Sequence, residues 1–322
     1  MRHFKYIDVK RAVSWVGTLL MLASLGFIAR RIFVTHGDVD FSVFTDPVIL
    51  AGLISVALLE GVGIILASLN YRAIVANVSG IRVRPTLAVV VYTLSNLYKY
   101  IPGGVMYVLG RNRMAVEDDS LSHTKVAAST VLEGVFIVIA VILIAAVFSF
   151  EHSMYYIRQV ERLPLVGLIL FIVLAAAAPI VYNNRHRLSK LLREFLKDAN
   201  VFRPGVIVIR LCCVLVLMGL WTFTFLATLM LLGQPMTLSL GITVMGLYLL
   251  AWLAGFLTPG APSGLGVREV VMMMFMSGTL NEGILISAMV MHRLLTVLGD
   301  VSAYGMALAY ARAKRLDAER VA

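Results

Sequence analysis

The run TPGAPSGLG, at residues 258–266, interrupts an apolar stretch that extends over 239–277. A shorter interruption, the run PGG at 102–104, lies within the apolar stretch 86–110. Proline and clustered glycine break helices, and a broken backbone is tolerated at membrane depth only inside protein or beside a water-filled cavity. Each stretch is therefore predicted to be a broken helix that either crosses a membrane or re-enters and turns back.

The composition of the whole chain requires a membrane protein. Of its 322 residues, 60% are hydrophobic and only 14% are charged, and the mean hydropathy is +0.90. Soluble domains carry roughly 25% charged residues, because their surfaces must be solvated. A soluble enzyme, a secreted disulfide scaffold and a disordered chain are thus excluded. The two cysteines, Cys212 and Cys213, are adjacent and provide neither a disulfide framework nor a zinc site.

Uninterrupted apolar stretches mark the full membrane spans, since a helix needs about 20 apolar residues to cross the hydrocarbon layer. Together with the two interrupted stretches they predict an all-α polytopic membrane protein, with a single transmembrane domain over 1–322. It has six full transmembrane helices and two broken or re-entrant helical elements, and the alternative is eight spans. The six full spans are predicted at 12–29, 47–69, 125–149, 164–182, 205–232 and 283–311.

The distribution of positive charge favours the six-span map. With the N-terminus inside and both broken stretches turning back, the cytoplasmic segments carry twenty Lys and Arg residues and the external segments carry four. Such a bias is typical of cytoplasmic loops. It predicts a multi-pass protein of the cell (inner, cytoplasmic) membrane with both termini cytoplasmic. The net charge of +10 then reflects orientation and contact with anionic lipid, and we expect no nucleic-acid partner.

Two larger features follow from this map. The first broken element enters from the cytoplasmic side and the second from the external side, so the halves 1–150 and 151–322 are candidate inverted repeats. Interrupted helices at matching positions of two halves point to a transporter's midplane site.

The segment 183–204 places leucines on one helical face and basic residues elsewhere. It is predicted to be an amphipathic helix on the cytoplasmic lipid surface, or otherwise a solvated connector.

Both interruptions belong to longer motifs. One reads SNLYKYIPGG over 95–104 and ends in Gly110-Arg111, and the other reads TPGAPSGLGVRE over 258–269. Together they resemble the lysylphosphatidylglycerol synthase transmembrane-region family of flippase-like membrane proteins, and the resemblance covers essentially the whole chain. Glu133 is similar to the family's intramembrane acidic position. In the family the residue after this acidic position is usually an arginine, whereas in this chain it is Gly134. No fixed ion pair is therefore expected at Glu133.

The resemblance implies a stand-alone member that lacks the synthase domain and moves a lipid between leaflets. The expected ligand is an anionic phospholipid or a lipid-linked glycan. We expect no enzyme activity, no cofactor and no metal, and no nucleotide-binding loop or catalytic triad stands out. An alternative function is a non-catalytic scaffold or accessory subunit for a membrane glycosyltransferase or lipid synthase, with 183–204 as the docking surface. A membrane transferase that uses Glu60 or Glu133 as a base is a third hypothesis.

The second interruption supplies the main candidate substrate-binding residues. Gly264 and Gly266 are expected to let the backbone approach a phosphate closely, in a break that includes Pro262. A helix is predicted to begin near Val267, which would offer free N–H groups to an anion. Arg268, in its first turn, is placed to bind phosphate through two parallel hydrogen bonds. Glu269 would hold Arg268, pair with Lys99 or Arg293, or contact a positively charged head group; otherwise both charges stabilise the helix bundle.

Other charges lie where orientation does not require them. The first interruption contributes Lys99, Pro102, Gly103, Gly104 and Arg111 as further candidate substrate contacts. Lys99 either contacts phosphate or reaches the interface, and Arg111 and Arg113 are interpreted first as charges that set topology. Glu60 and Glu133 are intramembrane carboxylates, for which function or protonated packing is expected. Finally, Arg293 and Asp300 are seven residues apart and share a helix face with His292 near it, so this face is predicted to point inward.

Overall fold

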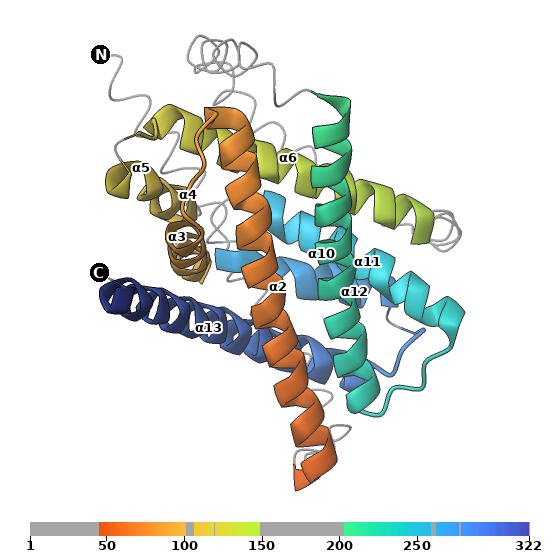
Figure 1. Cartoon of the computed structure of the whole chain (residues 1–322). Helices are drawn as coiled ribbons and strands as arrows, with labels where there is room; N and C mark the ends of the chain where they lie inside the picture. Colours follow the sequence, from red (N-terminus) through yellow and green to blue (C-terminus); the bar gives the residue numbers. More distant parts are fainter. Residues whose placement is uncertain are drawn as a thin grey trace, which may run out of the picture.

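The computed structural model describes residues 45–100, 106–118, 120–148, 203–258, 262–276 and 278–321. The predicted spans 12–29 and 164–182, the segment 183–204 as far as residue 202, and Pro102, Gly103 and Gly104 lie outside these described residues. Figure 1 shows that the described elements are helices, as the sequence predicts.

Five of the described helices are long and apolar enough to cross a membrane, which confirms a multi-pass membrane protein. Four of them contain or match predicted full spans, and α2 and α13 continue past the predicted ends at residues 69 and 311 to Ser79 and Val321. The fifth, α11, is the first half of the stretch 239–277, and its 20 residues suffice by length to cross without the part beyond the break. The five are α2 (Pro47–Ser79), α6 (His123–Phe148), α10 (Pro204–Leu231), α11 (Leu238–Leu257) and α13 (Glu282–Val321).

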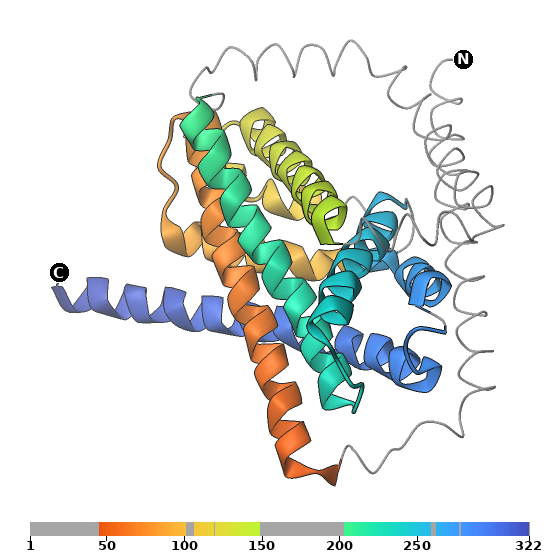
Figure 2. The same ribbon diagram turned by 90° about the vertical axis from the view of Figure 1, so that its right-hand side faces the viewer.

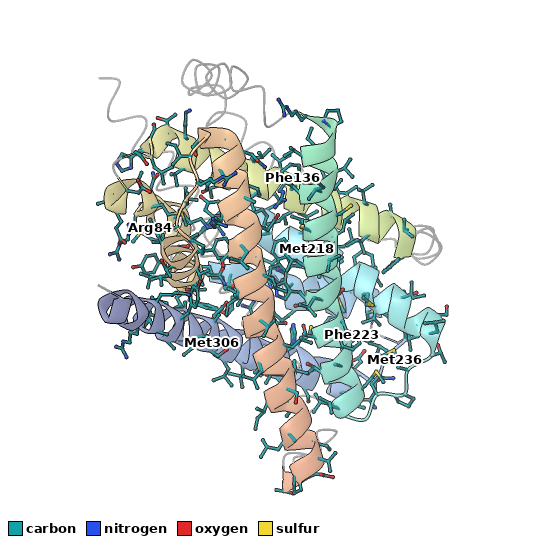
Figure 3. The ribbon with its side chains drawn as sticks, in the orientation of Figure 1. Arg84, Phe136, Met218, Phe223, Met236 and Met306 are labelled. Carbon is teal, nitrogen blue, oxygen red and sulfur yellow. The ribbon has the colours of Figure 1, made fainter. Side chains whose placement is uncertain are left out.

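The surface of this bundle is apolar over much of the described chain. Phe223 on α10 and Met306 on α13, both labelled in Figure 3, are 51% and 36% exposed. Large aliphatic side chains are likewise exposed on α2 and α6, including Leu58 and Val131. Outward-facing apolar side chains in such number suit contact with lipid rather than with water.

Helix α2 is stabilised at both ends by local sequence. The Asp46 carboxylate accepts a hydrogen bond of 2.7 Å from the backbone N–H of Val48, and Pro47 occupies the first helical position. Both residues suit an N-terminus, because aspartate satisfies a free N–H and proline needs none. The helix ends at Ser79 and is capped by Gly80, whose φ of 75° is the left-handed conformation that glycine adopts readily.

Helices α2 and α10 lie side by side, and α13 crosses them at a steep angle (Figures 1 and 2). Glycine makes the crossing of α2 and α13 close. A Cβ atom on Gly299 would lie 3.0 Å from the carbonyl oxygen of Ala57 and 2.5 Å from the Cβ of Glu60. Gly61 of α2 approaches α13 equally closely. A Cβ atom on Gly61 would lie 3.0 Å from the carbonyl oxygen of Gly299. This contact brings Glu60 directly against α13.

The first interrupted stretch is a broken helix, as predicted. Helix α3 (Pro85–Leu97) continues into the 3-10 turn η3 (Tyr98–Tyr100), and the chain resumes as α4 (Met106–Arg111) and α5 (Met114–Glu117). Within the described part, α3 packs against α2 and α13, and α4 packs back against α3 and α6. The break therefore leaves η3 half-buried, with Lys99 and Tyr100 in contact with Asp300 of the last helix.

The second interrupted stretch is also broken as predicted. Helix α11 ends at Leu257, the turn η4 (Pro262–Gly264) follows, and α12 (Val267–Met276) begins at the predicted residue. Ser263, Gly264 and Gly266 have φ values of 51°, 67° and 87°, which are all left-handed. The turn folds back on α11, because a Cβ on Gly264 would lie 2.7 Å from the Cα of Gly255. Glycine at 264 thus permits a backbone-to-backbone contact within the protein.

The methionines that follow this break belong to the packed core. Met272, Met273 and Met276 are 1%, 4% and 0% exposed and pack with side chains of α10, α11 and α13. These three side chains therefore contribute to the packing of the core.

Candidate functional site

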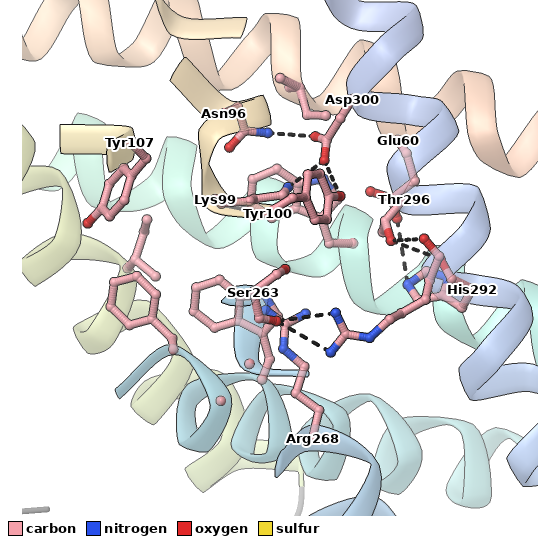
Figure 4. A pocket seen from close by; sticks show the side chains of 18 of the residues that line it. Glu60, Asn96, Lys99, Tyr100, Tyr107, Ser263, Arg268, His292, Thr296 and Asp300 are labelled. Atoms are coloured by element: carbon pink, nitrogen blue, oxygen red, sulfur yellow. Dashed lines mark hydrogen bonds and ion pairs between the residues drawn. The ribbon is translucent and has the colours of Figure 1, made fainter. Parts of the chain in front are cut away.

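A central cavity of about 460 Å³ lies between the two broken elements and helices α2, α6, α10 and α13. Figure 4 shows that its side chains come from elements far apart in the sequence and converge on one space. The volume falls in the range of small-molecule sites, about 300–1,000 Å³. Predicted residues from both motifs line it, namely Lys99, Arg111, Gly264, Arg268 and Glu269, together with Glu60, Glu133 and Arg293 from uninterrupted helices.

Asp300 of α13 organises the side of the cavity next to the first break. Its Oδ2 lies 2.7 Å from Lys99 Nζ and accepts a short hydrogen bond from the Tyr100 hydroxyl. Its Oδ1 accepts a hydrogen bond of 2.6 Å from Asn96 Nδ2. Asp300 is 1% exposed, whereas the Lys99 side chain is 30% exposed and also lies over the Tyr100 ring. Three donors of one broken element therefore satisfy a single buried carboxylate (Figure 4).

Glu269 connects the second break to the same helix. Its Oε1 accepts a hydrogen bond of 2.8 Å from Arg293 Nε, and its Oε2 accepts one of 2.8 Å from the backbone N–H of Gly266. Arg293 also places Nη1 and Nη2 3.4 Å from the carbonyl oxygen of Ser263. Of the partners considered from sequence, Glu269 thus pairs with Arg293. At Gly266 the expectation of a free N–H is wrong, because the Glu269 carboxylate occupies that donor.

Arg111 and Glu133 form a buried ion pair on the opposite side of the cavity. Arg111 Nη1 donates a short hydrogen bond to Glu133 Oε2, and the side chains are 6% and 5% exposed. Glu133 Oε1 accepts a hydrogen bond of 2.9 Å from Tyr92. The guanidinium carbon lies 4.6, 4.2 and 5.5 Å from the ring centroids of Tyr71, Tyr92 and Tyr107, which are cation–π distances.

This pair corrects two expectations from the sequence. The interpretation of Arg111 as a charge that sets topology is wrong, because the side chain is buried and paired; Arg113, which pairs with Glu117 on the surface, fits it. The absence of an arginine after Glu133 does not leave that carboxylate without a cation. The cation arrives from α4, which folds back against α6.

Arg268 differs from the other cations of the cavity. Its side chain is half-buried, its Nε is buried, and none of the hydrogen bonds or ion pairs between described residues involves its guanidinium. The guanidinium carbon lies 5.3 Å from the centroid of Trp252, and the Trp252 ring stacks on Phe256 with a centroid distance of 5.1 Å. Arg268 is therefore held by an aromatic face beside the cavity, and its hydrogen-bonding groups have no anionic partner in the described chain.

Glu60 and His292 form a fourth polar group, at the crossing of α2 and α13. Both residues are 3% exposed. Thr224 of α10 donates a short hydrogen bond to Glu60 Oε1, and His292 Nε2 lies 3.8 Å from the same oxygen. The other imidazole nitrogen, Nδ1, is 3.4 Å from Thr228 Oγ1. Nε2 itself is buried and has no hydrogen-bond partner in the described chain.

Sequence reasoning missed several residues of this site. Asn96 and Tyr100 lie inside the quoted motif, but nothing in the sequence indicated that they bind Asp300. Thr224 is one of few hydroxyl residues in an apolar span, which was the available signal for a partner of an intramembrane carboxylate. The tyrosines around Arg111 and the tryptophan under Arg268 have no local pattern, since they come from four different helices, α2, α3, α4 and α11.

Of the remaining predicted residues, Pro262 opens the turn η4 and Gly266 precedes α12. The described residues contain no group of three His, Cys, Asp or Glu side chains that could hold a metal ion. Comparison of the chain with protein-family models and with curated proteins finds no match.

Proposed function

We propose that this protein binds the anionic head group of a phospholipid or lipid-linked glycan in the central cavity and moves it between membrane leaflets. The observation that carries the proposal is Arg268. It is a half-buried guanidinium in the first turn of α12, it lines the cavity, and no described carboxylate forms an ion pair with it. Every other cation that lines the cavity among the described residues has a carboxylate partner.

The physical requirement for such a site comes from the head group's charge. A phosphate that leaves water for an apolar layer loses its hydration, which is prohibitive unless polar groups replace the water. A guanidinium suits this role, because it can donate two parallel hydrogen bonds to phosphate and remains charged. With its guanidinium against Trp252, Arg268 is positioned before a ligand arrives.

The meeting of the two motifs supports the same proposal. The residues that resemble the lysylphosphatidylglycerol synthase transmembrane-region family come from both interrupted stretches and from α6. Lys99, Arg111, Glu133, Arg268 and Glu269 all line one cavity. Interrupted helices around a shared midplane site are a recurrent arrangement in transporters.

We place the protein in the cell membrane with six full spans, two broken elements and both termini cytoplasmic. The positive charge of the predicted cytoplasmic segments supports this orientation. Burial of Arg111 removes one charge from the segment 111–125 but leaves Arg113 and Lys125 there.

A head-group accessibility assay tests the function. Purified protein is reconstituted into liposomes that contain phosphatidylglycerol with a fluorophore on its acyl chain, and dithionite added outside quenches the outer leaflet. We expect wild-type protein to carry labelled lipid from the inner to the outer leaflet, so that dithionite outside quenches the label of both leaflets. Loss of charge-assisted hydrogen bonds worth about 1.5–3 kcal/mol should slow Arg268→Gln roughly tenfold to hundredfold.

Two controls make the result specific. Arg113→Gln removes a surface cation that is 52% exposed and should translocate lipid at the wild-type rate. Arg268→Lys keeps the charge without the bidentate geometry and should fall between wild type and Arg268→Gln. Equal rates for wild type, Arg268→Gln and empty liposomes would reject translocation and leave the scaffold hypothesis standing.

A further inference from the structure

The charges that line the central cavity balance except at two positions. The described lining contains the cations Lys99, Arg111, Arg268 and Arg293 and the carboxylates Glu60, Glu133, Glu269 and Asp300. Three ion pairs account for six of these groups. Arg268 and Glu60 remain, and they do not pair with each other. Among the described lining residues, Arg268 is thus the single cation left for an anionic ligand. When a singly charged anion binds it, the cavity is neutral if Glu60 is protonated and carries one negative charge if Glu60 is ionised.

Glu60 has few groups that would stabilise its charge. From α10 it receives the Thr224 hydroxyl, and from α13 it faces His292 at 3.8 Å. Lys99, Asp300 and Arg268 act on it electrostatically from farther away, and Lys99 and Asp300 already pair with each other. A carboxylate that is 3% exposed and has no bonded cation is costly to maintain as an anion.

His292 is the residue that can accept a hydrogen bond from a protonated Glu60. Its ring is 3% exposed and packs edge-on against Phe225 and Tyr248, with centroid distances of 5.4 and 5.6 Å. When Nδ1 carries the proton and donates to Thr228, Nε2 presents a lone pair. That unsatisfied lone pair faces the lone pairs of Glu60 Oε1 across 3.8 Å. One proton shared between Nε2 and Oε1 would give both lone pairs a hydrogen-bond partner. The two side chains can therefore bind one proton in the interior of the protein.

We propose that Glu60 and His292 hold one proton, which the cavity takes up when a monoanionic phosphodiester binds Arg268. This inference rests on the proposed function and adds the charge class of the substrate and a coupled ion. The proton comes from water at the cavity and leaves when the head group leaves, and no covalent bond changes. The same two residues are fixed by the crossing of α2 and α13, so a shift of either helix changes the distance between Glu60 and His292.

The charge balance selects among anionic head groups. With Glu60 protonated and Arg268 charged, the lining carries one net positive charge among the described residues, which a phosphodiester cancels. A diphosphate or a doubly ionised phosphomonoester would leave one uncompensated negative charge, which is expensive in a low-dielectric site. The site should therefore favour phosphodiester lipids over phosphatidic acid.

Calorimetry tests the proton directly. Short-chain phosphatidylglycerol is titrated into the purified full chain in detergent, at one pH, in two buffers that differ in ionisation enthalpy. The buffer dependence of the heat gives the number of protons exchanged, and we expect uptake of about one per lipid at a pH where Glu60 is ionised in the free protein. Above that pH the Kd should rise about tenfold per pH unit.

Two variants separate the residues' roles. Glu60→Gln keeps an acceptor for Thr224 and is permanently neutral, so it should bind the lipid without proton exchange and with a Kd that does not vary with pH. His292→Phe keeps a ring between Phe225 and Tyr248 but removes the proton acceptor. It should move the pH at which affinity falls to a lower value, because the protonated carboxyl loses its partner.

The outcomes distinguish this inference from the proposed function. Lipid binding by wild type with no proton uptake and no pH dependence would overturn the inference and leave binding at Arg268 intact. If Arg268→Gln binds as tightly as wild type, the proposed function fails. Equal affinity for phosphatidylglycerol and short-chain phosphatidic acid would contradict the assigned charge class.

Discussion

Lys99 and Asp300 join the first broken element to the last helix through an ion pair of 2.7 Å. Asp300 also accepts hydrogen bonds from Asn96 and Tyr100, so α3 and η3 contribute all three of its side-chain partners among the described residues. The second broken element reaches the same helix through Glu269 and Arg293. One face of α13 thus binds both broken elements. Asp300 on this face contacts the first and Arg293 contacts the second.

The asymmetry of the Lys99–Asp300 pair predicts unequal effects of its two substitutions. Asp300→Asn should lower the free energy of unfolding by about 1–3 kcal/mol, because asparagine keeps one acceptor oxygen but turns an amide group toward buried donors, while the partly exposed Lys99 can reach water. Lys99→Met should cost more, about 3–5 kcal/mol, because it leaves the Asp300 carboxylate, which is 1% exposed, buried without a cation. Thermal unfolding in detergent micelles measures both.

The surface pair Arg113–Glu117 supplies the control for that comparison. Its side chains are 52% and 44% exposed, so Arg113→Gln should leave stability within about 0.5 kcal/mol of wild type. A smaller loss for Lys99→Met than for Asp300→Asn would contradict this expectation, because it would show that the Asn96 and Tyr100 donors stabilise the buried Asp300 carboxylate without a cation.

The buried pair of Arg111 and Glu133 predicts strong coupling in a double-mutant cycle. Arg111→Met alone leaves a buried carboxylate without a cation and should cost about 3–5 kcal/mol. Glu133→Gln alone leaves a buried guanidinium unpaired. The double variant should lose less than the sum of the single losses, with a coupling of about 1–3 kcal/mol. Chemical unfolding of the four proteins in mixed micelles gives the cycle, and additive losses would contradict the pairing.

The breaks and the first turn of α12 were predictable from sequence, because their causes are local. Proline removes a backbone donor and glycine admits positive φ, so the runs at 102–104 and 258–266 indicate where a helix stops. The start of α12 at Val267, with Arg268 in its first turn, follows from the same signal. The apolar length of α2, α6, α10 and α13 likewise fixes their approximate bounds.

The partners of the charges were not predictable, because they depend on how helices cross. Nothing near Glu133 indicates that its cation comes from Arg111, since that contact requires α4 to fold back on α6. The proximity of Glu60 to His292 depends on the close approach at Gly299, a glycine with no distinguishing neighbours in the sequence. Spacing along α13 showed that Arg293 and Asp300 share a face, but not which side chains that face meets.

The turn at Gly264 predicts a stability effect for adding one methyl group. Gly264→Ala would hold alanine at a φ of 67°, which costs about 1–2 kcal/mol, and would place its Cβ 2.7 Å from the Cα of Gly255. The clash is with backbone, which cannot rotate away, so the total loss should exceed the conformational cost. Thermal unfolding in micelles checks this loss.

A second glycine gives the matched comparison for Gly264. Gly219 lies within α10, and a Cβ there would meet no other described atom within 4 Å. Gly219→Ala should therefore raise stability, by up to about 1 kcal/mol, through helix propensity alone. If both alanine variants behave alike, the close approach of η4 to α11 is not what makes Gly264 necessary.

Cysteine labelling distinguishes the two membrane maps, because they place the same residues on opposite sides. In the six-span map the segment around Arg113 is cytoplasmic and the turn between α10 and α11 is external. If both broken elements cross, the two positions exchange sides. Arg113 and Pro235 are exposed and lie outside the candidate spans, so Arg113→Cys and Pro235→Cys are suitable sites.

The experiment uses a background in which Cys212 and Cys213 are replaced by serine, since Cys212 is exposed in the described structure. A membrane-impermeant maleimide is added to intact spheroplasts and, separately, after permeabilisation. We expect Pro235→Cys to react in intact spheroplasts and Arg113→Cys to react only after permeabilisation, because the positive charges hold 111–125 inside. The reverse pattern would establish the eight-span map, and reaction of both positions from outside would contradict both maps, because each map places the two positions on opposite sides of the membrane.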